Sequence, residues 1–162
     1  MHDLKITAPE GERTIVMTRT FNAPRALVWK ALSEPEHAVR WWGPHGHRNK
    51  VLKWDWKVGG EWSIESTLPD GQVITFFGEY REIDAPGKVT QTFAFDGLPP
   101  GVHSLDTVVL EDHGDRTVYR ATSIAPDIAA RDGMLASGME VGVIEGFERL
   151  DQLLDDWKAQ AA

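Results

Sequence analysis

Hydrophobic patterning divides the chain into a helical start, a long β-rich middle and a helical end. Between about residues 48 and 124, apolar and polar residues alternate with the period of two that is typical of strands with one buried face. Turn signals such as Gly59-Gly60 and Ala85-Pro86 separate the runs. We therefore predict six consecutive antiparallel strands here, and the β-rich segment 14–21 adds a seventh.

Two short helices are predicted between the first two strands. Asn22-Ala23-Pro24 is a helix start that leads into residues 24–32, because proline is tolerated in a first helical turn. Ser33 and Glu36 have the spacing of a capping box, which would begin a second helix. Gly43-Pro44 would end that helix. Residues 1–12 are polar, and we expect them to form a loose lead-in.

The last predicted element is one long amphipathic helix from Gly138 to Ala159, preceded by a short irregular segment. Ser137 and Glu140 again have capping-box spacing. One stripe of this helix carries Met139, Val143, Phe147, Leu150, Leu154 and Trp157. At 1.5 Å per residue the helix would be ~33 Å long, which is enough to cross a small sheet.

This order of elements predicts an α+β helix-grip fold. A sheet with one apolar face and one amphipathic helix is expected to curl so that the helix lies on its concave side. The two short helices would cap the end where sheet and helix diverge. We expect one domain over residues 1–162, with its core at about 14–159.

Three glycines recur every four residues in the predicted long helix: Gly138, Gly142 and Gly146. Each should destabilise a helix interior by about 1 kcal/mol relative to alanine, so something must offset the loss. One explanation is close approach of the helix to the sheet or to the short helices. The other is that the missing side chains keep a ligand cavity open. Val141 and Ile144 point away from the apolar stripe, either as isolated exposed residues or as a dimer contact.

Aromatic residues are concentrated on the predicted concave face. Six of the seven tryptophans lie between positions 29 and 62. Core filling must account for most of these rings, yet they exceed what one helix stripe covers, and ligand sites are apolar clefts with a few polar groups. We therefore predict an apolar ligand pocket lined by Trp42, Trp54, Trp56, Trp62, Ile64, Phe76, Tyr80, Phe93, Phe95, Met139, Gly142, Val143, Gly146 and Phe147. Val73 and Phe77 leave the inward face of strand 72–83 ambiguous.

The composition of the chain excludes several classes of protein function. Lys and Arg number 17 against 25 Asp and Glu, a net charge of −8, which argues against binding to nucleic acid or to an anionic membrane. The chain has no cysteine, which excludes thiolate chemistry and fits a cytoplasmic protein. The N-terminus has no apolar signal core, and no apolar run approaches the length of a membrane span.

Catalytic and metal signals are weak. His37, His45 and His47 are close in sequence, but no acidic residue stands at helical spacing to complete a metal site, so we predict neither a metal nor a cofactor. No nucleophile elbow or phosphate-binding loop appears. Tyr80 is the clearest inward polar residue, and Glu79 or Arg81 would face inward only with a bulge. We assign no catalytic residue, and we expect a binding protein more than an enzyme.

Several separated motifs resemble those of a known family. The residues are Phe21-Asn22-Ala23-Pro24, Arg40-Trp41-Trp42-Gly43-Pro44, Val58-Gly59-Gly60-Glu61-Trp62, Gly78-Glu79-Tyr80, Ser137-Gly138-Met139-Glu140 and Arg149-Leu150-Asp151. Over about residues 14–157 the chain resembles SRPBCC proteins related to the C-terminal domain of the activator of heat-shock protein 90 ATPase. The resemblance implies the START-like, birch-pollen-allergen-like helix-grip fold.

The resemblance does not by itself choose a function, because this fold hosts hydrophobic-ligand binders, cyclases and co-chaperone domains. Our leading hypothesis is a small hydrophobic ligand, aromatic or lipid-like, held between sheet and C-terminal helix. The second is a co-chaperone-like or stress-associated protein-interaction module, with a chaperone or another copy of the chain as partner. The third is a polyketide cyclase or aromatase.

Overall fold

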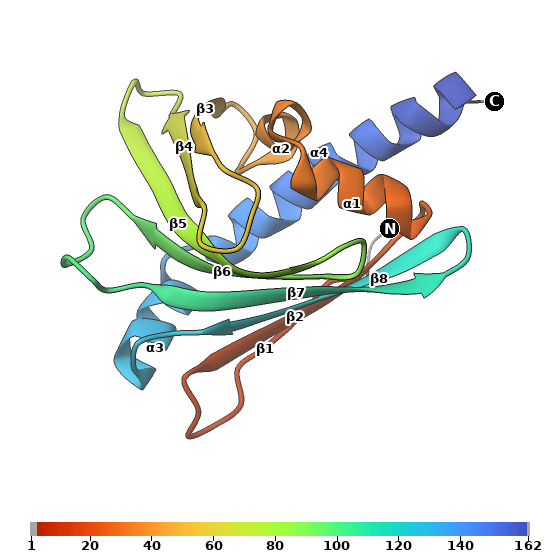
Figure 1. Cartoon of the computed structure of the whole chain (residues 1–162). Coiled ribbons are helices and arrows are strands. Elements are labelled where there is room, and N and C mark those ends of the chain that lie inside the picture. Colours follow the sequence, from red (N-terminus) through yellow and green to blue (C-terminus); the bar gives the residue numbers. More distant parts are fainter. Residues whose placement is uncertain (1–2, 162) are drawn as a thin grey trace.

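A computed structural model of the protein describes residues 3–161. It has an α+β fold in which an eight-stranded antiparallel sheet curves around a long C-terminal helix (Figure 1). The elements are β1 (Lys5–Thr7), β2 (Thr14–Phe21), α1 (Arg25–Ser33), α2 (Pro35–Trp41), β3 (Arg48–Trp54), β4 (Glu61–Thr67), β5 (Val73–Asp84), β6 (Lys88–Phe95), β7 (Ser104–His113), β8 (Arg116–Ile124), α3 (Ile128–Ala136) and α4 (Met139–Ala161). The strand order is β1-β2-β8-β7-β6-β5-β4-β3, and the predicted helix-grip fold is confirmed.

The sheet has one strand more than the sequence pattern predicts. β1 pairs with β2, with Ile6 opposite Met17, inside the segment expected to be a loose lead-in. Leu4, just before β1, packs against the hydrophobic core. A strand of three residues is too short to display a period of two, which explains why the pattern did not reveal it.

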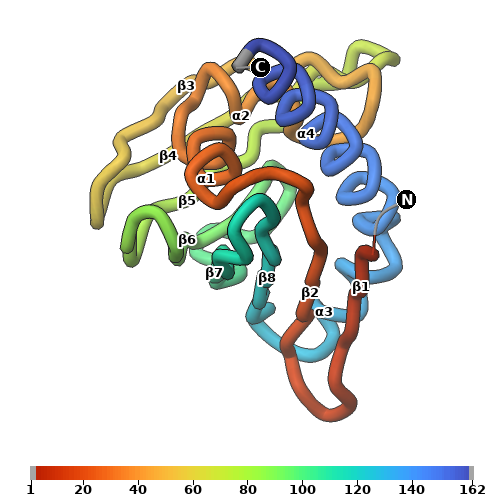
Figure 2. The backbone as a smooth tube through the Cα atoms, turned by 90° about the vertical axis from the view of Figure 1, so that its right-hand side faces the viewer, coloured from red at the N-terminus to blue at the C-terminus, as the bar shows by residue number. Residues whose placement is uncertain are grey.

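Helices α1, α2 and α4 lie on the inner side of the arc formed by the strands (Figure 2). The core fills the space between them and the sheet, with Val28, Leu150 and Leu154 fully buried. α1 lies over the end of the sheet where β7 turns into β8, since the Thr117 hydroxyl donates to the Ala23 carbonyl across 2.8 Å. At the opposite end of the sheet, where β7 begins and β8 ends, the chain continues into α3, which contacts α4 and β2.

Both predicted capping boxes are wrong. Ser33 is the last residue of α1, and α2 begins at Pro35 after Glu34, with no side-chain cap hydrogen bond. Ser137 donates its hydroxyl to the Met134 carbonyl across 2.6 Å. In both places a preceding helix runs up to the serine, so the extended backbone that an N-cap needs is not available to it.

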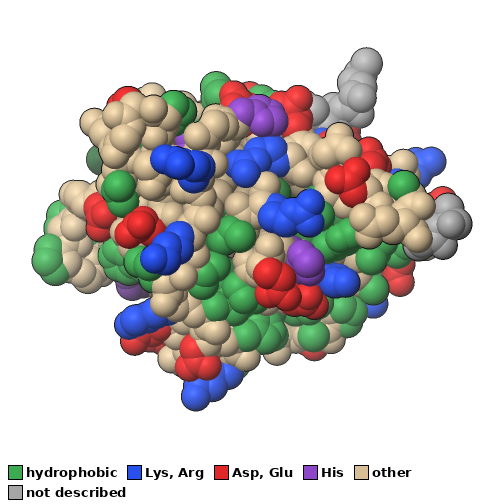
Figure 3. Space-filling view, turned by 90° about the horizontal axis from the view of Figure 1, so that it is seen from above, with side chains coloured by type: hydrophobic (Ala, Val, Ile, Leu, Met, Phe, Trp, Pro, Cys, Tyr) green, Lys and Arg blue, Asp and Glu red, His purple; other side chains and the backbone are tan. Residues whose placement is uncertain are grey.

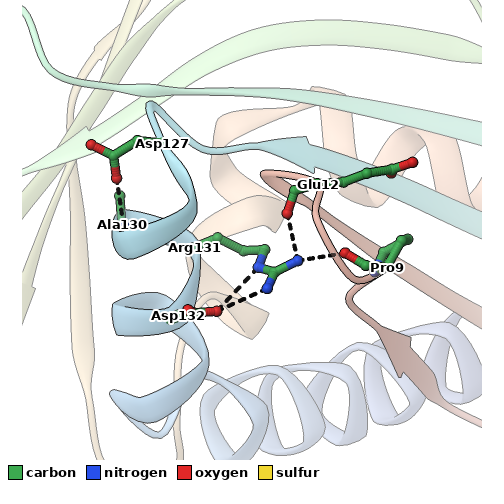
Figure 4. Close-up of polar contacts among 6 residues, drawn as sticks. All are labelled: Pro9, Glu12, Asp127, Ala130, Arg131 and Asp132. Carbon is green, nitrogen blue, oxygen red and sulfur yellow. Dashed lines mark hydrogen bonds and ion pairs between the residues drawn. The ribbon is translucent and has the colours of Figure 1, made fainter.

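Helix α3 occupies the segment that was expected to be irregular. The Asp127 carboxylate accepts from the Ala130 backbone N–H across 2.7 Å and begins the helix (Figure 4). Arg131 is buried and donates to the carbonyls of Pro9 and Glu12, which holds α3 against the turn between β1 and β2 (Figure 4). This long-range anchor outweighs the helix-weakening effect of Gly133, which alone suggested an interruption.

Two strands show how bulges alter the predicted faces. A register shift between Val51 and Lys53 places Leu52 outside the regular alternation, and its side chain is 46% exposed instead of sharing the face of Trp54. In β5 the ambiguity is resolved, because Tyr80 is fully buried whereas Phe77 is 43% exposed. Even-numbered residues of β5 up to Tyr80 therefore face inward.

Candidate functional site

The predicted pocket residues separate into groups with different surroundings. The first group comprises Trp54, Trp56 and Tyr80, and it packs against Trp29 of α1, whose ring centroid lies 5.8 Å from that of Trp56. The indoles of Trp54 and Trp56 are stacked 6.3 Å apart, and the Trp56 and Tyr80 rings are 4.8 Å apart. Trp54 Nε1 donates to the Ser33 carbonyl across 3.0 Å, at the C-terminus of α1. These rings therefore tie α1 to the sheet.

The second group lies further along the concave face and is centred on Trp42. Its ring centroid lies 5.7 Å from that of Phe76, 5.8 Å from that of Trp62 and 6.3 Å from that of Phe93. Phe95 continues the cluster, 6.3 Å from Phe93. These separations are those of directly interacting aromatic rings. Trp62 and Ile64 are buried at the base of the cluster.

Nine of the predicted pocket residues remain partly exposed, among them Trp54 and Trp56 of the first group and Gly142 on α4. We call the other six the apolar rim: Trp42, Phe76, Phe93, Phe95, Met139 and Val143. The aromatic members face inward from the sheet or from the end of α2, and Val143 on α4 packs against the core. A side chain on a concave face retains exposed surface only where solvent reaches that face. Solvent therefore reaches the concave face at the rim, and it also reaches Trp54 and Trp56, which are partly exposed beside α1.

Phe147 belongs to the core instead of the rim. Its ring centroid lies 5.2 Å from that of Phe21 and 5.1 Å from that of Tyr119, in edge-to-face arrangements. Its side chain is buried where α4 crosses β2 and β8. The residue thus fixes the position of α4 over the sheet.

The helical glycines lie against the turn that follows α2. A Cβ at Gly146 would stand 3.1 Å from the Trp41 carbonyl oxygen, whereas a Cβ at Gly142 would make an ordinary 3.7 Å contact with Pro44. Gly138 precedes α4 with φ of +84° and is not part of the helix. Close approach of α4 to the α2–β3 turn, one of the two explanations considered, accounts for Gly146.

Arg149 reinforces the same contact. Its Nη1 donates to the carbonyls of Trp42, Gly43 and Pro44 across 3.0, 3.2 and 3.2 Å. The backbone N–H of His45 donates to the Glu145 carboxylate across 2.9 Å. The turn that carries Trp42 to the rim is therefore attached to α4 through backbone groups.

An acidic residue that the sequence analysis did not single out lies on the concave face. Asp106 on β7 stands opposite Gln91 on β6 and Ser123 on β8. Its Oδ1 accepts from the hydroxyls of Ser123, across 2.6 Å, and Ser104, across 3.0 Å. Desolvation raises the pKa of the Asp106 carboxyl despite these two donors. The sequence contained a signal for this position, because Asp106 and Leu110 are an even number of residues apart on one strand and therefore share its inward face.

Tyr80 does not have the properties of a general base. Burial raises the pKa of its phenol, so the group stays protonated at neutral pH. The register shift after Tyr80 leaves Glu79 and Arg81 together, joined by an ion pair of 3.2 Å, beside Phe77 on the convex side of the sheet. The alternative in which a bulge turns them inward is therefore wrong.

Two hollows lie away from the rim. One, of about 450 Å³, lies on the convex side of β4–β6 and is lined by Phe77, Thr92 and His103 among others. The second, of about 830 Å³, is open and lies beside the start of α3. On the face seen from above, basic and acidic side chains are interspersed (Figure 3).

The prediction that no acidic residue stands at helical spacing from the three neighbouring histidines is wrong for His37, because Glu34 lies three residues earlier and its carboxylate is 3.2 Å from the His37 imidazole. Within residues 3–161, one group of three potential ligands is close enough to hold an ion, and it comprises Glu34, Glu36 and His37 on and beside the first turn of α2. His45 and His47 do not belong to it. The His37 imidazole also packs edge-on against Trp157, with centroids 4.7 Å apart.

Comparison with known families places this architecture. The family model described as activator of Hsp90 ATPase homolog 1-like protein, AHSA1, matches residues 22–155. The chain belongs to the AHSA1 family. The resemblance seen in the separated motifs is thereby confirmed, and the family, within the SRPBCC superfamily, generally binds hydrophobic ligands. No curated protein matches the sequence.

Solved structures share the fold over nearly the whole AHSA1 chain. A protein from Arthrobacter aurescens has a TM-score of 0.86 at 25% identity, covering 94% of this chain and 91% of that one. A protein from Rhodobacter sphaeroides has a TM-score of 0.86 at 22% identity, with 95% and 99% covered. One from Mycobacterium smegmatis has a TM-score of 0.83 at 22% identity, with 94% and 97% covered. Within residues 3–161, none of the helices has the length and apolar character needed to span a bilayer.

Proposed function

We propose that this AHSA1-family protein binds a small hydrophobic molecule on the concave face of its sheet, between β5–β7 and the N-terminal half of α4. One observation carries the proposal: the six side chains of the apolar rim are partly exposed although they belong to the interior face. Removing such apolar surface from water stabilises a complex by roughly 25 cal/mol for every Å² that the ligand covers. A ligand of flat, apolar shape would recover that free energy.

The binding test uses two neighbouring residues on opposite faces of β5. Phe76 belongs to the rim, whereas Phe77 lies on the convex face beside the 450 Å³ hollow. Naphthylethanol, a neutral aromatic probe, is titrated into the wild-type protein and into Phe76→Ala and Phe77→Ala, with binding followed by calorimetry. We expect Phe76→Ala to lower the affinity about tenfold, because one aromatic contact is worth on the order of 1–1.5 kcal/mol.

The matched pair makes the outcome decisive. Loss of binding in Phe77→Ala with retention in Phe76→Ala would move the site to the convex hollow and overturn the proposal. The proposal would also be overturned if the wild-type chain bound none of the naphthyl probes. Circular dichroism of both variants checks that the sheet is intact.

A further inference from the structure

The polar residues of the concave face bear on which hydrophobic molecules the rim accepts. Asp106 and Gln91 are direct cross-strand neighbours, and Phe93 of the rim is two residues from Gln91 on the same face of β6. At about 3.3 Å per residue along a strand, the row that carries Asp106 lies roughly 7 Å beyond the row that carries Phe93. A molecule stacked on Phe93 therefore needs only a two-carbon arm to reach the carboxyl group.

The Asp106 carboxyl has one oxygen engaged and one available. Both serine hydroxyls donate to Oδ1, and within residues 3–161 no hydrogen bond is made to Oδ2. The buried side-chain atoms without a partner are Arg19 Nε, His37 Nδ1 and Trp62 Nε1, so Oδ2 is not among the fully occluded atoms. The residue as a whole is half-buried. Oδ2 is thus an acceptor without a hydrogen-bond partner among the described residues, and it retains some exposed surface.

The carboxyl group also has no counter-charge in the part of the chain that the structure describes. It takes part in none of the ion pairs there. Its pKa is shifted by burial and by the hydrogen bonds from Ser123 and Ser104, and not by an arginine or a lysine. Arg19, a buried basic residue on β2, is already paired with Asp151. A partly desolvated carboxylate without a cation is unfavourable, and an opposite charge held close to it removes that penalty.

We propose that the ligand is a hydrophobic or aromatic amine, whose ammonium group pairs with Asp106 while its apolar part packs on the rim. This inference rests on the proposed function and specifies the chemical class of the molecule. The ammonium donates to Oδ2, and Gln91, the cross-strand neighbour of Asp106, carries an amide oxygen that can serve as a second acceptor. Acidic ligands of the same shape are disfavoured, because they would bring a second negative charge to the carboxylate.

The test compares three probes of nearly the same shape: naphthylethylamine, naphthylethanol and naphthylacetate. We expect the wild-type protein to bind the amine at least about tenfold more tightly than the alcohol, and the acid more weakly than either. The Asp106→Asn variant should bind the amine no more tightly than the alcohol. The affinity for the alcohol should differ by less than about twofold between this variant and the wild type. Asn retains an oxygen for Ser104 and Ser123, so the local structure is preserved.

Asp112→Asn is the matched control, because Asp112 lies on the same strand, is exposed and changes the net charge equally. It should leave the preference for the amine unchanged. If the wild-type chain binds amine and alcohol equally, or if Asp106→Asn retains the preference, the inference fails while the proposed function stands. If none of the three probes binds, the proposed function fails as well. The wild-type ratio requires no variant and so does not depend on how Asp106→Asn folds.

Discussion

Arg19 on β2 and Asp151 on α4 form two parallel hydrogen bonds, with Nη1–Oδ1 at 2.7 Å and Nη2–Oδ2 at 2.5 Å. Arg19 is only 4% exposed, and its guanidinium also lies 4.5 Å above the Phe21 ring. The pair joins β2 to α4, the helix that the sheet surrounds. A guanidinium in such surroundings depends on its partner, because a buried charge without one is strongly destabilising.

Asp151→Ala should therefore lower the free energy of unfolding by about 2 kcal/mol, somewhat less than for a fully buried pair because the Asp151 side chain is 39% exposed. Urea denaturation measures the change. Asp155→Ala on the same helix is the control, since Asp155 is 64% exposed beside Lys158 and should matter by less than about 0.5 kcal/mol. Equal losses in the two variants would contradict a special role for the Arg19 pair.

The two glycines of α4 should respond differently to alanine. Gly142→Ala adds a methyl group in ordinary contact with Pro44, so it should stabilise the protein by about 0.5–1 kcal/mol through helix propensity. Gly146→Ala brings the methyl group to 3.1 Å from the Trp41 carbonyl oxygen, which should cancel that gain or reverse it. Thermal unfolding of both variants measures the difference. A gain of the same size in both would show that the turn after α2 yields freely.

Two tryptophan-to-phenylalanine changes should separate folding from binding. Trp54→Phe removes the hydrogen bond to the Ser33 carbonyl and should destabilise the fold by about 1–2 kcal/mol, with little effect on naphthylethanol affinity. Trp42→Phe should weaken probe binding with a smaller effect on stability, because the Trp42 ring lies among the rim side chains and its indole N–H makes no hydrogen bond within residues 3–161. Calorimetric titration and urea denaturation of the same two samples give both quantities. The reverse assignment would place the ligand beneath α1.

The raised pKa of Asp106 predicts a pH-dependent effect on stability. Because its pKa is higher in the folded protein, the folded state binds more protons, and the free energy of unfolding falls as pH rises from the unfolded-state value toward the folded one. Asp106→Asn abolishes this loss. The variant should be more stable than the wild type at pH 7, with an advantage that disappears below about pH 4. An advantage that grows on acidification would have the wrong sign.

The fold could be predicted because its elements have strong periodic signals. The alternation of Trp62 with Ile64 and the α4 stripe through Phe147 and Leu154 depend on one buried face each, and the structure buries all four. Those signals are local, and so is the turn chemistry that separates the strands. Four of the six family motifs lie at such turns or helix ends, whereas Gly78-Glu79-Tyr80 lies within β5 and Arg149-Leu150-Asp151 within α4.

What the sequence could not supply depends on contacts between distant segments. Leu52 is expelled by a bulge, and α3 is held by Arg131 against a turn about 120 residues earlier. The division of the aromatic residues into core and rim likewise depends on where α1 ends, which no periodicity records. Strand alternation alone places Asp106 on the inward face. Its polar surroundings become known only from the strand pairing, which sets Gln91 and Ser123 opposite it.

The attachment of the α2–β3 turn through carbonyl groups has a consequence for variation of the binding surface. Arg149 bonds to the backbone oxygens of residues 42, 43 and 44, so the side chain at position 42 can be exchanged without releasing the turn from its helix. Specificity at this edge could thus diversify by single substitutions while the scaffold stays constant. The same arrangement offers protein engineers one position at which to reshape the entrance for molecules of other sizes.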